Sequence, residues 1–234
     1  MLFKTPVFIY NFFMVYKKGL LLIIVGFILI SIMTVIIIFN LPGRNTAIPK
    51  MSPPIIVNHP IRPSLLMPFI RDGDIILRMS DSVWSHIFCN YSENDKRFSH
   101  LGIVRLKEDD VTVIHCEGSF TNKDLGVEEL PLEYFLKVAT SVGVYRVKNA
   151  DGAIISNTAV KYLNYPFDFN FDLDDESTIY CTELLYHSLK PVKLEHILST
   201  RYAEEVKKNI IPLDAISYSP YIDEIVYIIR RKMQ

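Results

Sequence analysis

The chain has few cysteines and no excess of positive charge, and both absences limit what it can be. Its three cysteines are too few to build the disulfide framework of a small secreted scaffold in 234 residues. Residues 51–234 carry 20 basic and 26 acidic side chains. Because binding to a phosphate backbone needs a basic surface, nucleic acid is not expected as a partner. A hydrophobic share of 50% excludes a wholly disordered chain.

One stretch, residues 19–43, contains no charged residue at all. Within it, residues 20–39 are almost entirely Leu, Ile, Val, Phe and Met. Twenty helical residues at ~1.5 Å each span about 30 Å, which is the thickness of a bilayer core. This pattern predicts a transmembrane anchor at residues 19–40, after a short N-terminal segment at residues 1–18. A cleaved signal peptide is the alternative, but no small-residue cleavage site follows the apolar run.

Basic residues flank this apolar segment unevenly. Lys4, Lys17 and Lys18 precede it, whereas Arg44 and Lys50 follow it closely. The positive-inside rule therefore places the N-terminus in the cytoplasm. We therefore expect the chain to cross the cytoplasmic membrane once, with its C-terminal domain outside the cytoplasm. The membrane is then one of its partners.

Proline separates the anchor from the rest of the chain. Seven prolines fall between residues 40 and 70, and since proline lacks the backbone donor that helices and sheets use, residues 41–70 are predicted to be an extended linker. Residues 71–234 are predicted to form one α+β domain. Expected strands span residues 74–79, 101–106, 111–116, 142–147 and 224–230, and expected helices span residues 81–91, 152–163 and 178–189.

Cys181 is the strongest candidate nucleophile. It falls in the first turn of the helix expected over residues 178–189, which Ser177 would cap. Free backbone N–H groups and the helix dipole favour a thiolate at such a position. The alternative is a buried core cysteine, which is the commoner fate of a free cysteine. Cys89 is expected at a helix end and Cys116 inside a strand, so both are weaker candidates.

Two histidines are expected to lie close together. His100 begins the strand before the charged loop at residues 107–110, and His115 ends the strand after it. In an antiparallel hairpin these positions meet near the same end of the sheet, where one imidazole can orient another that acts as a base. A pair of satisfied, half-buried histidines is the alternative. The spacing of these histidines relative to Cys116 and Cys181 matches no compact zinc pattern, so neither a metal nor a cofactor is expected.

Four segments follow one another in the order found in one enzyme family. They are Gly73–Arg78, Phe98–Val104, Val113–Glu117 and Tyr180–Leu185. Together they resemble the permuted papain-like cysteine hydrolases of the YiiX/YebB type, relatives of the NlpC-type cell-wall peptidases and of the lecithin retinol acyltransferase group. The resemblance implies a small papain-like domain in which an antiparallel sheet packs on helices and the histidine precedes the cysteine.

The resemblance also implies roles for individual residues. Cys181 corresponds to the nucleophile and His100 to the general base. His115 corresponds to the residue that orients the base, with Glu117 as the alternative third residue. Tyr180 is expected to line the oxyanion site, and Glu183 to supply a hydrogen-bonding group behind the cysteine.

The predicted function is therefore that of a membrane-anchored cysteine hydrolase that cleaves an amide bond, with cell-wall peptide as the expected substrate. Two alternatives remain open at this point. The enzyme could hydrolyse or transfer acyl groups of lipid amides or esters, or the domain could be an inactive, membrane-tethered binding module.

Overall fold

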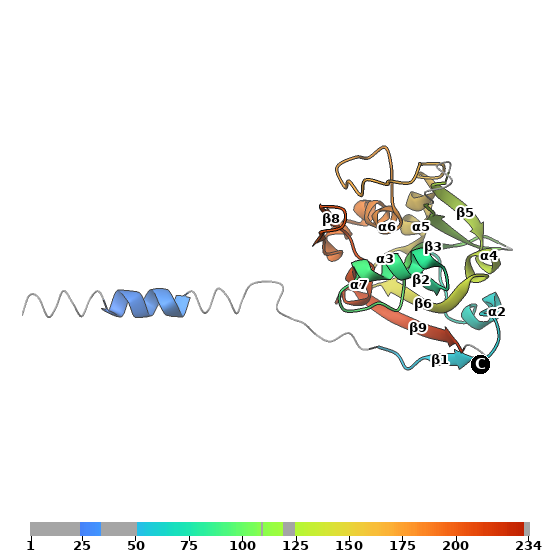
Figure 1. Ribbon diagram of the computed structural model, residues 1–234, viewed down its shortest axis with the longest axis horizontal. Coiled ribbons are helices and arrows are strands. Elements are labelled where there is room, and N and C mark those ends of the chain that lie inside the picture. The colour runs from blue at the N-terminus through green and yellow to red at the C-terminus, as the bar shows by residue number, and fades with distance from the viewer. Residues whose placement is uncertain (1–23, 34–50, 109, 119–124, 232–234) are drawn as a thin grey trace, which may run out of the picture. The chain divides into compact units, whose positions relative to one another are not determined.

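The computed structural model describes residues 24–33, 51–108, 110–118 and 125–231, and the chain divides into two compact units at residues 47 and 48 (Figure 1). In the first unit, residues 24–33 form a helix with mostly exposed side chains. The rest of the predicted anchor at residues 19–40, and the segment 1–18, lie outside the described residues. In the parts of the chain just given, no helix is both long enough and apolar enough to cross a membrane.

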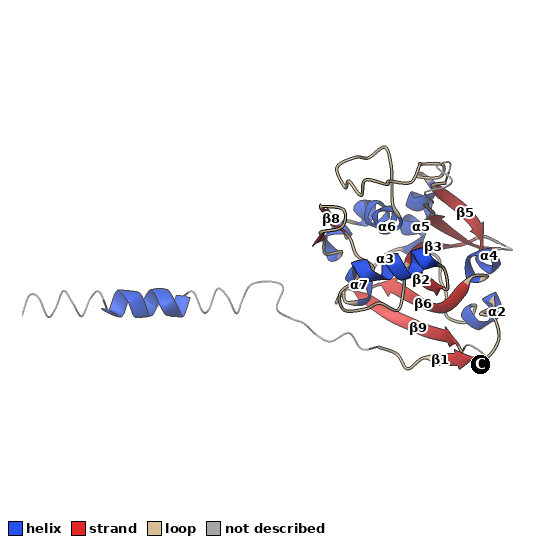
Figure 2. Cartoon of the chain, viewed as in Figure 1, coloured by secondary structure: helices blue, strands red, loops and turns tan. Residues whose placement is uncertain are grey.

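The second unit is built on a seven-stranded sheet with the strand order β1-β9-β6-β2-β3-β4-β5 (Figure 2). All neighbouring strands are antiparallel except the edge pair β1 and β9, which is parallel. The strands are β1 (Ile55–Val57), β2 (Ile75–Ser80), β3 (His100–Leu106), β4 (Val111–Cys116), β5 (Val127–Pro131), β6 (Ala139–Val147) and β9 (Ile222–Arg230).

Short helices and a small hairpin complete this unit. The helices are α2 (Pro63–Leu66), α3 (Val83–Phe88), α4 (Leu132–Leu136), α5 (Gly152–Val160), α6 (Cys181–Leu189) and α7 (Asp214–Ser217). Three 3₁₀ turns are η1 (Cys89–Tyr91), η2 (Lys190–Val192) and η3 (Glu195–Ile197), and β7 (Arg201–Ala203) pairs with β8 (Lys208–Ile210).

Helices cover both faces of the sheet, because apolar side chains alternate along its central strands. Ile75 and Leu77 of β2 belong to a core shared with α5 and α6, whereas Ile76 between them belongs to a core shared with α2 and α4. A sheet covered on both faces removes enough apolar surface from water to stabilise a domain of this size. The α+β class and the largely antiparallel sheet are thus as predicted.

The proline-rich segment joins the domain earlier than its composition predicts. From residue 51 onwards it contributes β1 at the sheet edge and α2, and Ile61 and Leu66 are buried. Pro63 opens α2 at a helix position that needs no backbone donor, so proline is tolerated there. The predicted linker at residues 41–70 is therefore corrected over residues 51–70, which belong to the compact unit.

The first turn of the helix that carries Cys181 also differs from the sequence-based expectation. Helix α6 begins at Cys181, with Tyr180 as its N-cap residue. The Ser177 hydroxyl instead donates to Oδ1 of Asp175 at 2.6 Å, within a local turn. A serine beside an aspartate can satisfy either a helix end or a turn, and here the turn prevails.

Candidate active site

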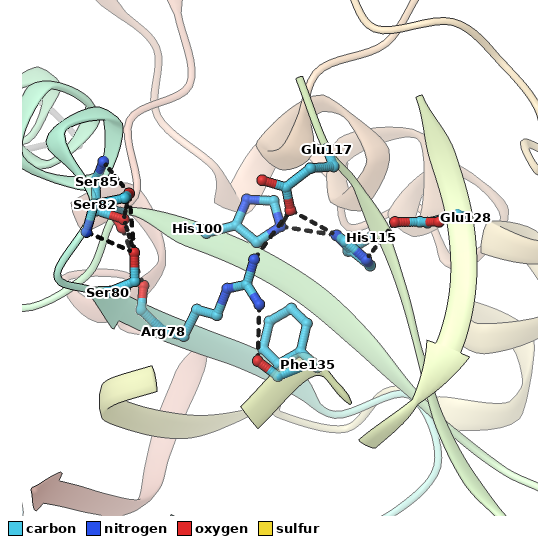
Figure 3. Close-up of polar contacts among 10 residues, drawn as sticks. Arg78, Ser80, Ser82, Ser85, His100, His115, Glu117, Glu128 and Phe135 are labelled. Carbon is cyan, nitrogen blue, oxygen red and sulfur yellow. Dashed lines mark hydrogen bonds and ion pairs between the residues drawn. The ribbon is translucent and has the colours of Figure 1, made fainter. Parts of the chain in front are cut away.

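The pairing of β3 with β4 brings the two predicted histidines together. Gly102 lies opposite His115 in this pair, and His100, two residues before Gly102, shares the face of His115. Nε2 of His100 lies 2.9 Å from Nδ1 of His115, with the two rings nearly perpendicular at 89° (Figure 3). The hairpin thus forms and the imidazoles meet at one of its ends, as the sequence pattern indicates.

A glutamate on the next strand faces the far side of His115. Strand β5 places Glu128 directly opposite His115, and Oε1 of Glu128 lies 3.3 Å from Nε2 of His115 (Figure 3). The contact does not count as a hydrogen bond, and the buried Nε2 has no hydrogen-bond partner among the described residues. The Glu128 side chain is 51% exposed. The His115 side chain lowers the pKa of Glu128.

Glu117 and Arg78 lie beside the same pair. Oε2 of Glu117 is 3.5 Å from Nε2 of His100 and 3.5 Å from Nδ1 of His115. Nη2 of Arg78 lies 3.0 Å from that oxygen, and its Nη1 donates to the carbonyl of Phe135 at 2.8 Å. The guanidinium therefore balances the charge of Glu117 beside the imidazoles.

The Phe135 ring forms the floor beneath the histidines. Its centroid is 5.9 Å from that of His100 in a stacked arrangement and 5.5 Å from that of His115. Gly102 makes room for it, because a Cβ on this glycine would lie 3.2 Å from Cε2 of Phe135 and 2.3 Å from Cγ1 of Val113. A side chain at residue 102 would displace the ring that fixes the imidazole planes.

Cys181 stands at the start of α6, beside the beginning of β3. It is partly exposed, whereas Cys89 and Cys116 are buried. The backbone N–H of Thr182 and that of Leu101, the residue after His100, are placed to stabilise a charge on its sulfur. The thiol of Cys116 donates to a backbone carbonyl at 2.9 Å, which is a structural role. Cys181 is therefore the cysteine that the fold brings next to the histidine strand.

The residues around Cys181 hold the start of α6 in place. Glu183 is fully buried; its Oε2 accepts from the backbone N–H of Tyr180 at 3.3 Å, and its Oε1 contacts Nε2 of His187 at 3.2 Å. The Tyr180 hydroxyl accepts from the backbone N–H of Ile211 at 3.0 Å. Glu183 is thus the hydrogen-bonding group behind the cysteine, while the hydroxyl of Tyr180 is used to anchor the helix start.

Burial sets the protonation of the two central groups. It raises the pKa of Cys181 to about 12, against the lowering effect of the N–H groups of Thr182 and Leu101. Burial, together with the neighbouring Arg78 and His115, lowers the pKa of His100 well below its ordinary value. The helix position alone favours a thiolate, but loss of hydration outweighs it, so thiol and imidazole are both neutral at pH 7 in the free protein.

This protonation state predicts a slow resting thiol. At pH 7, Cys181 in the folded chain should react with iodoacetamide at least about tenfold more slowly than the same cysteine in urea, because each unit of raised pKa lowers the thiolate fraction tenfold. Its rate should still be rising at pH 9. Peptide mass spectrometry after timed alkylation measures each cysteine separately. Rapid reaction at pH 6 that is lost on unfolding would instead reveal a thiolate–imidazolium pair.

A cavity of about 680 Å³ opens on the histidine face of the sheet. His100, Glu117 and Arg78 are among the residues that line it. Its other walls carry apolar and polar groups from α3 and α4 and from the segments beside them, among them Trp84, Phe88, Tyr134, Lys137 and Ser85. Its size is that of a site for a small peptide or a comparable ligand.

Two residues of this cluster escape sequence reasoning. Arg78 is the last residue of the family-like segment Gly73–Arg78, but only the pairing of β2 with β3 places it opposite His100. Glu128 lies in a strand that the sequence pattern did not reveal, and only the pairing of β4 with β5 places it opposite His115. Residues 127–131 are Val-Glu-Glu-Leu-Pro, which show no alternation of apolar and charged residues, so no local pattern indicates β5.

Comparison with known proteins identifies the family and the fold of this chain. The model of a family described as permuted papain-like amidase enzymes of the YaeF/YiiX type matches residues 69–209. No curated protein matches the chain in a sequence search. Among solved structures, one described as the metalloprotein YiiX from Escherichia coli O157:H7 superposes with a TM-score of 0.55 at 17% identity, covering 67% of this chain and 96% of its own. At that identity the likeness shows the fold, and the family match shows that this chain belongs to the permuted papain-like amidases of the YaeF/YiiX type.

Proposed function

We propose that the protein is a membrane-anchored cysteine amidase in which Cys181 is the nucleophile, His100 the base and His115 the residue that orients it. The observation that carries this proposal is the 2.9 Å contact between His100 Nε2 and His115 Nδ1, on a strand whose next backbone N–H faces the sulfur of Cys181. A nucleophile, a base and an orienting group in one place are the parts that covalent acyl transfer needs.

The contacts support one assignment of the ring nitrogens. His115 Nε2 faces the Glu128 carboxylate, which is an acceptor, at 3.3 Å, so the proposal places the ring proton of His115 on this nitrogen. Nδ1 of His115 then accepts a hydrogen bond from the Nε2–H of His100. This leaves Nδ1 of His100 with a free lone pair, and that nitrogen is the base in the proposal. Glu117, the alternative third residue, contacts the shared edge of the two rings but completes no such chain.

The proposed reaction proceeds through an acyl-enzyme. His100 takes the thiol proton of Cys181 while the sulfur attacks the amide carbonyl, and the backbone N–H groups at the start of α6 stabilise the oxyanion. The C–N bond then breaks as His100 returns its proton to the leaving amine. Water, deprotonated by His100, attacks the thioester and releases the acid and the free thiol. Because both groups start neutral, the thiol proton has to move to His100 before or during the attack on the carbonyl.

The anchor and the location belong to the same proposal. The apolar, uncharged composition of residues 19–40 supports a single transmembrane helix, and the three lysines before it support an N-terminus in the cytoplasm. The amidase domain then lies outside the cytoplasmic membrane, where the peptides of the cell wall are the abundant amide substrates. A peptide amide also agrees with the family description.

The experiment is a substrate comparison with the full-length chain in detergent. Purified stem peptides from cell wall, and separately phospholipid vesicles, are incubated with the wild type and with Cys181→Ala, and newly formed amines or fatty acids are measured. Amine release from the peptides that requires Cys181 supports the proposal. Fatty-acid release alone would make the protein a lipid hydrolase, and no thiol-dependent product from either would favour a binding module.

A metal ion enters this proposal only as a competitor. YiiX, the solved neighbour, is described as a metalloprotein. In this chain the donors His100, His115 and Glu117 lie within 4.8 Å of one another, so the residues fit such an ion. A divalent ion supplies Lewis-acid chemistry wherever it binds, but here it would use the ring nitrogens on which the thiol mechanism depends.

A further inference from the structure

We propose that His100, His115 and Glu117 form a binding site for one divalent zinc-type ion, and that an ion bound there disables the thiol chemistry by taking over the base. The statement that the ion inhibits the enzyme, the inhibitory half of the proposal, rests on the proposed function. The statement that the ion binds does not. The site would make the amidase sensitive to free zinc.

The donor geometry is close to that of a tetrahedral zinc site. The three distances between the donor atoms are 2.9 Å for His100 Nε2 to His115 Nδ1 and 3.5 Å from each of these nitrogens to Glu117 Oε2. Zinc ligands about 2.0–2.1 Å from the metal at tetrahedral angles lie about 3.3–3.4 Å apart. Small side-chain shifts therefore place all three donors around one ion, leaving the fourth position open.

The surroundings of His115 are those of a metal ligand. Its side chain is 2% exposed, and its other ring nitrogen faces the Glu128 carboxylate at 3.3 Å (Figure 3). Metal-binding histidines commonly give their second N–H to a carboxylate, which fixes the tautomer and makes the ligand nitrogen more basic. Two donors sit on paired strands and the third follows directly after β4, so the cluster is held in place without any ion.

Arg78 opposes the ion and limits its affinity. Its Nη2 lies 3.0 Å from the same Glu117 oxygen that would bind the metal. A fixed positive charge there repels a divalent cation and competes for that oxygen. We therefore expect reversible binding that responds to zinc concentration, in contrast to a permanently filled structural site.

Metal binding would also move a proton to the wrong nitrogen of His100. In the proposed mechanism, Nε2 of His100 carries the proton in the free protein and Nδ1 is the base. To bind the ion through Nε2, the neutral ring must adopt the other tautomer, with its proton on Nδ1. The imidazole gains no charge, but Nδ1 can no longer accept the thiol proton of Cys181. The imidazole of His100 therefore cannot bind the ion and act as the base for acyl transfer at the same time.

Binding is tested on the full-length, chelator-treated protein in detergent with zinc or cobalt(II) alone. Calorimetry should show one zinc per chain, and cobalt(II) should give the visible absorption of a four-coordinate ion. Both signals should be lost in His115→Ala and Glu117→Gln, and Glu128→Gln should weaken binding about 10- to 100-fold. The exposed His86 on α3 gives the control, His86→Ala, which should bind normally. Absence of zinc binding, or binding that survives both ligand variants, would overturn the site.

Inhibition is tested with p-nitrophenyl acetate as a probe of Cys181 acylation. Zinc should slow the acylation of the wild type over the same concentration range in which calorimetry detects binding, and chelator should restore it. Zinc that binds at these residues yet leaves acylation unchanged, or accelerates it, would overturn the inhibitory half. If the metal-free protein shows no acylation that depends on Cys181, the proposed function fails while the calorimetry still decides whether the site exists.

Discussion

Replacing Cys181 with alanine should lower the rate of peptide-amide hydrolysis by at least about 10⁴-fold, which is the size of effect that removal of a nucleophile has in related mechanisms. The neighbouring hydroxyl of Thr182 donates to the carbonyl of Ile211 at 2.6 Å, which leaves Cys181 as the proposed nucleophile at the start of α6. His100→Ala should have a similarly large effect, because a thiol whose pKa is raised to about 12 needs a base to react at pH 7. The measurement is the initial rate of amine release from cell-wall stem peptides.

The double variant gives the sharper test. In the proposed mechanism the nucleophile and the base act as one unit, so Cys181→Ala/His100→Ala should be no slower than Cys181→Ala alone. Multiplied effects would mean that the two residues act separately. Cys89→Ala is the matched control, because Cys89 is a buried thiol that belongs to none of the contacts of the site. Circular dichroism and the thermal midpoint show whether each variant is folded. A folded Cys181→Ala protein with undiminished turnover would refute the assignment.

Asp74→Ala should cost about 3–5 kcal/mol of unfolding free energy, the range found when one partner of a buried ion pair is removed. Asp74 is 1% exposed. Its two oxygens accept from Nε and Nη2 of Arg146, each at 2.7 Å, and one also accepts from the backbone N–H of Arg71 at 2.7 Å. Alanine leaves the partly buried guanidinium without its counter-charge at the start of β2, the strand that carries Arg78.

Urea unfolding and thermal melting measure this loss. For a domain of this size each kcal/mol corresponds to about 2–4 °C, so the midpoint should fall by roughly 6–20 °C. Lys148 and Asp223 form the matched control, since their 3.0 Å ion pair lies between the end of β6, the strand that carries Arg146, and β9, but is 42% and 59% exposed. Asp223→Ala should change stability by no more than about 1 kcal/mol. Equal losses in the two variants would contradict the role assigned to burial.

The sequence by itself determined the local features of this protein. Strands repeat every two residues and a short loop fixes the register of a hairpin, so the spacing of His100 and His115 already placed them on one face at one end. Helix periodicity placed Cys181 in a first turn, although the cap itself shifted from Ser177 to Tyr180. The order of four short motifs indicated the family.

Tertiary structure alone decided the features that depend on neighbours far along the chain. Arg78 and Glu128 reach the histidines because β2 and β5 flank β3 and β4 in the sheet. The order of the strands in a sheet cannot be predicted from any single segment of the sequence. One ring nitrogen of His100, one of His115 and a carboxylate oxygen of Glu117 lie within 4.8 Å of one another. They come this close only because the hairpin is folded. The charge state of Cys181 follows from burial, which sums contributions from the whole domain and here outweighs the local effect of the helix end.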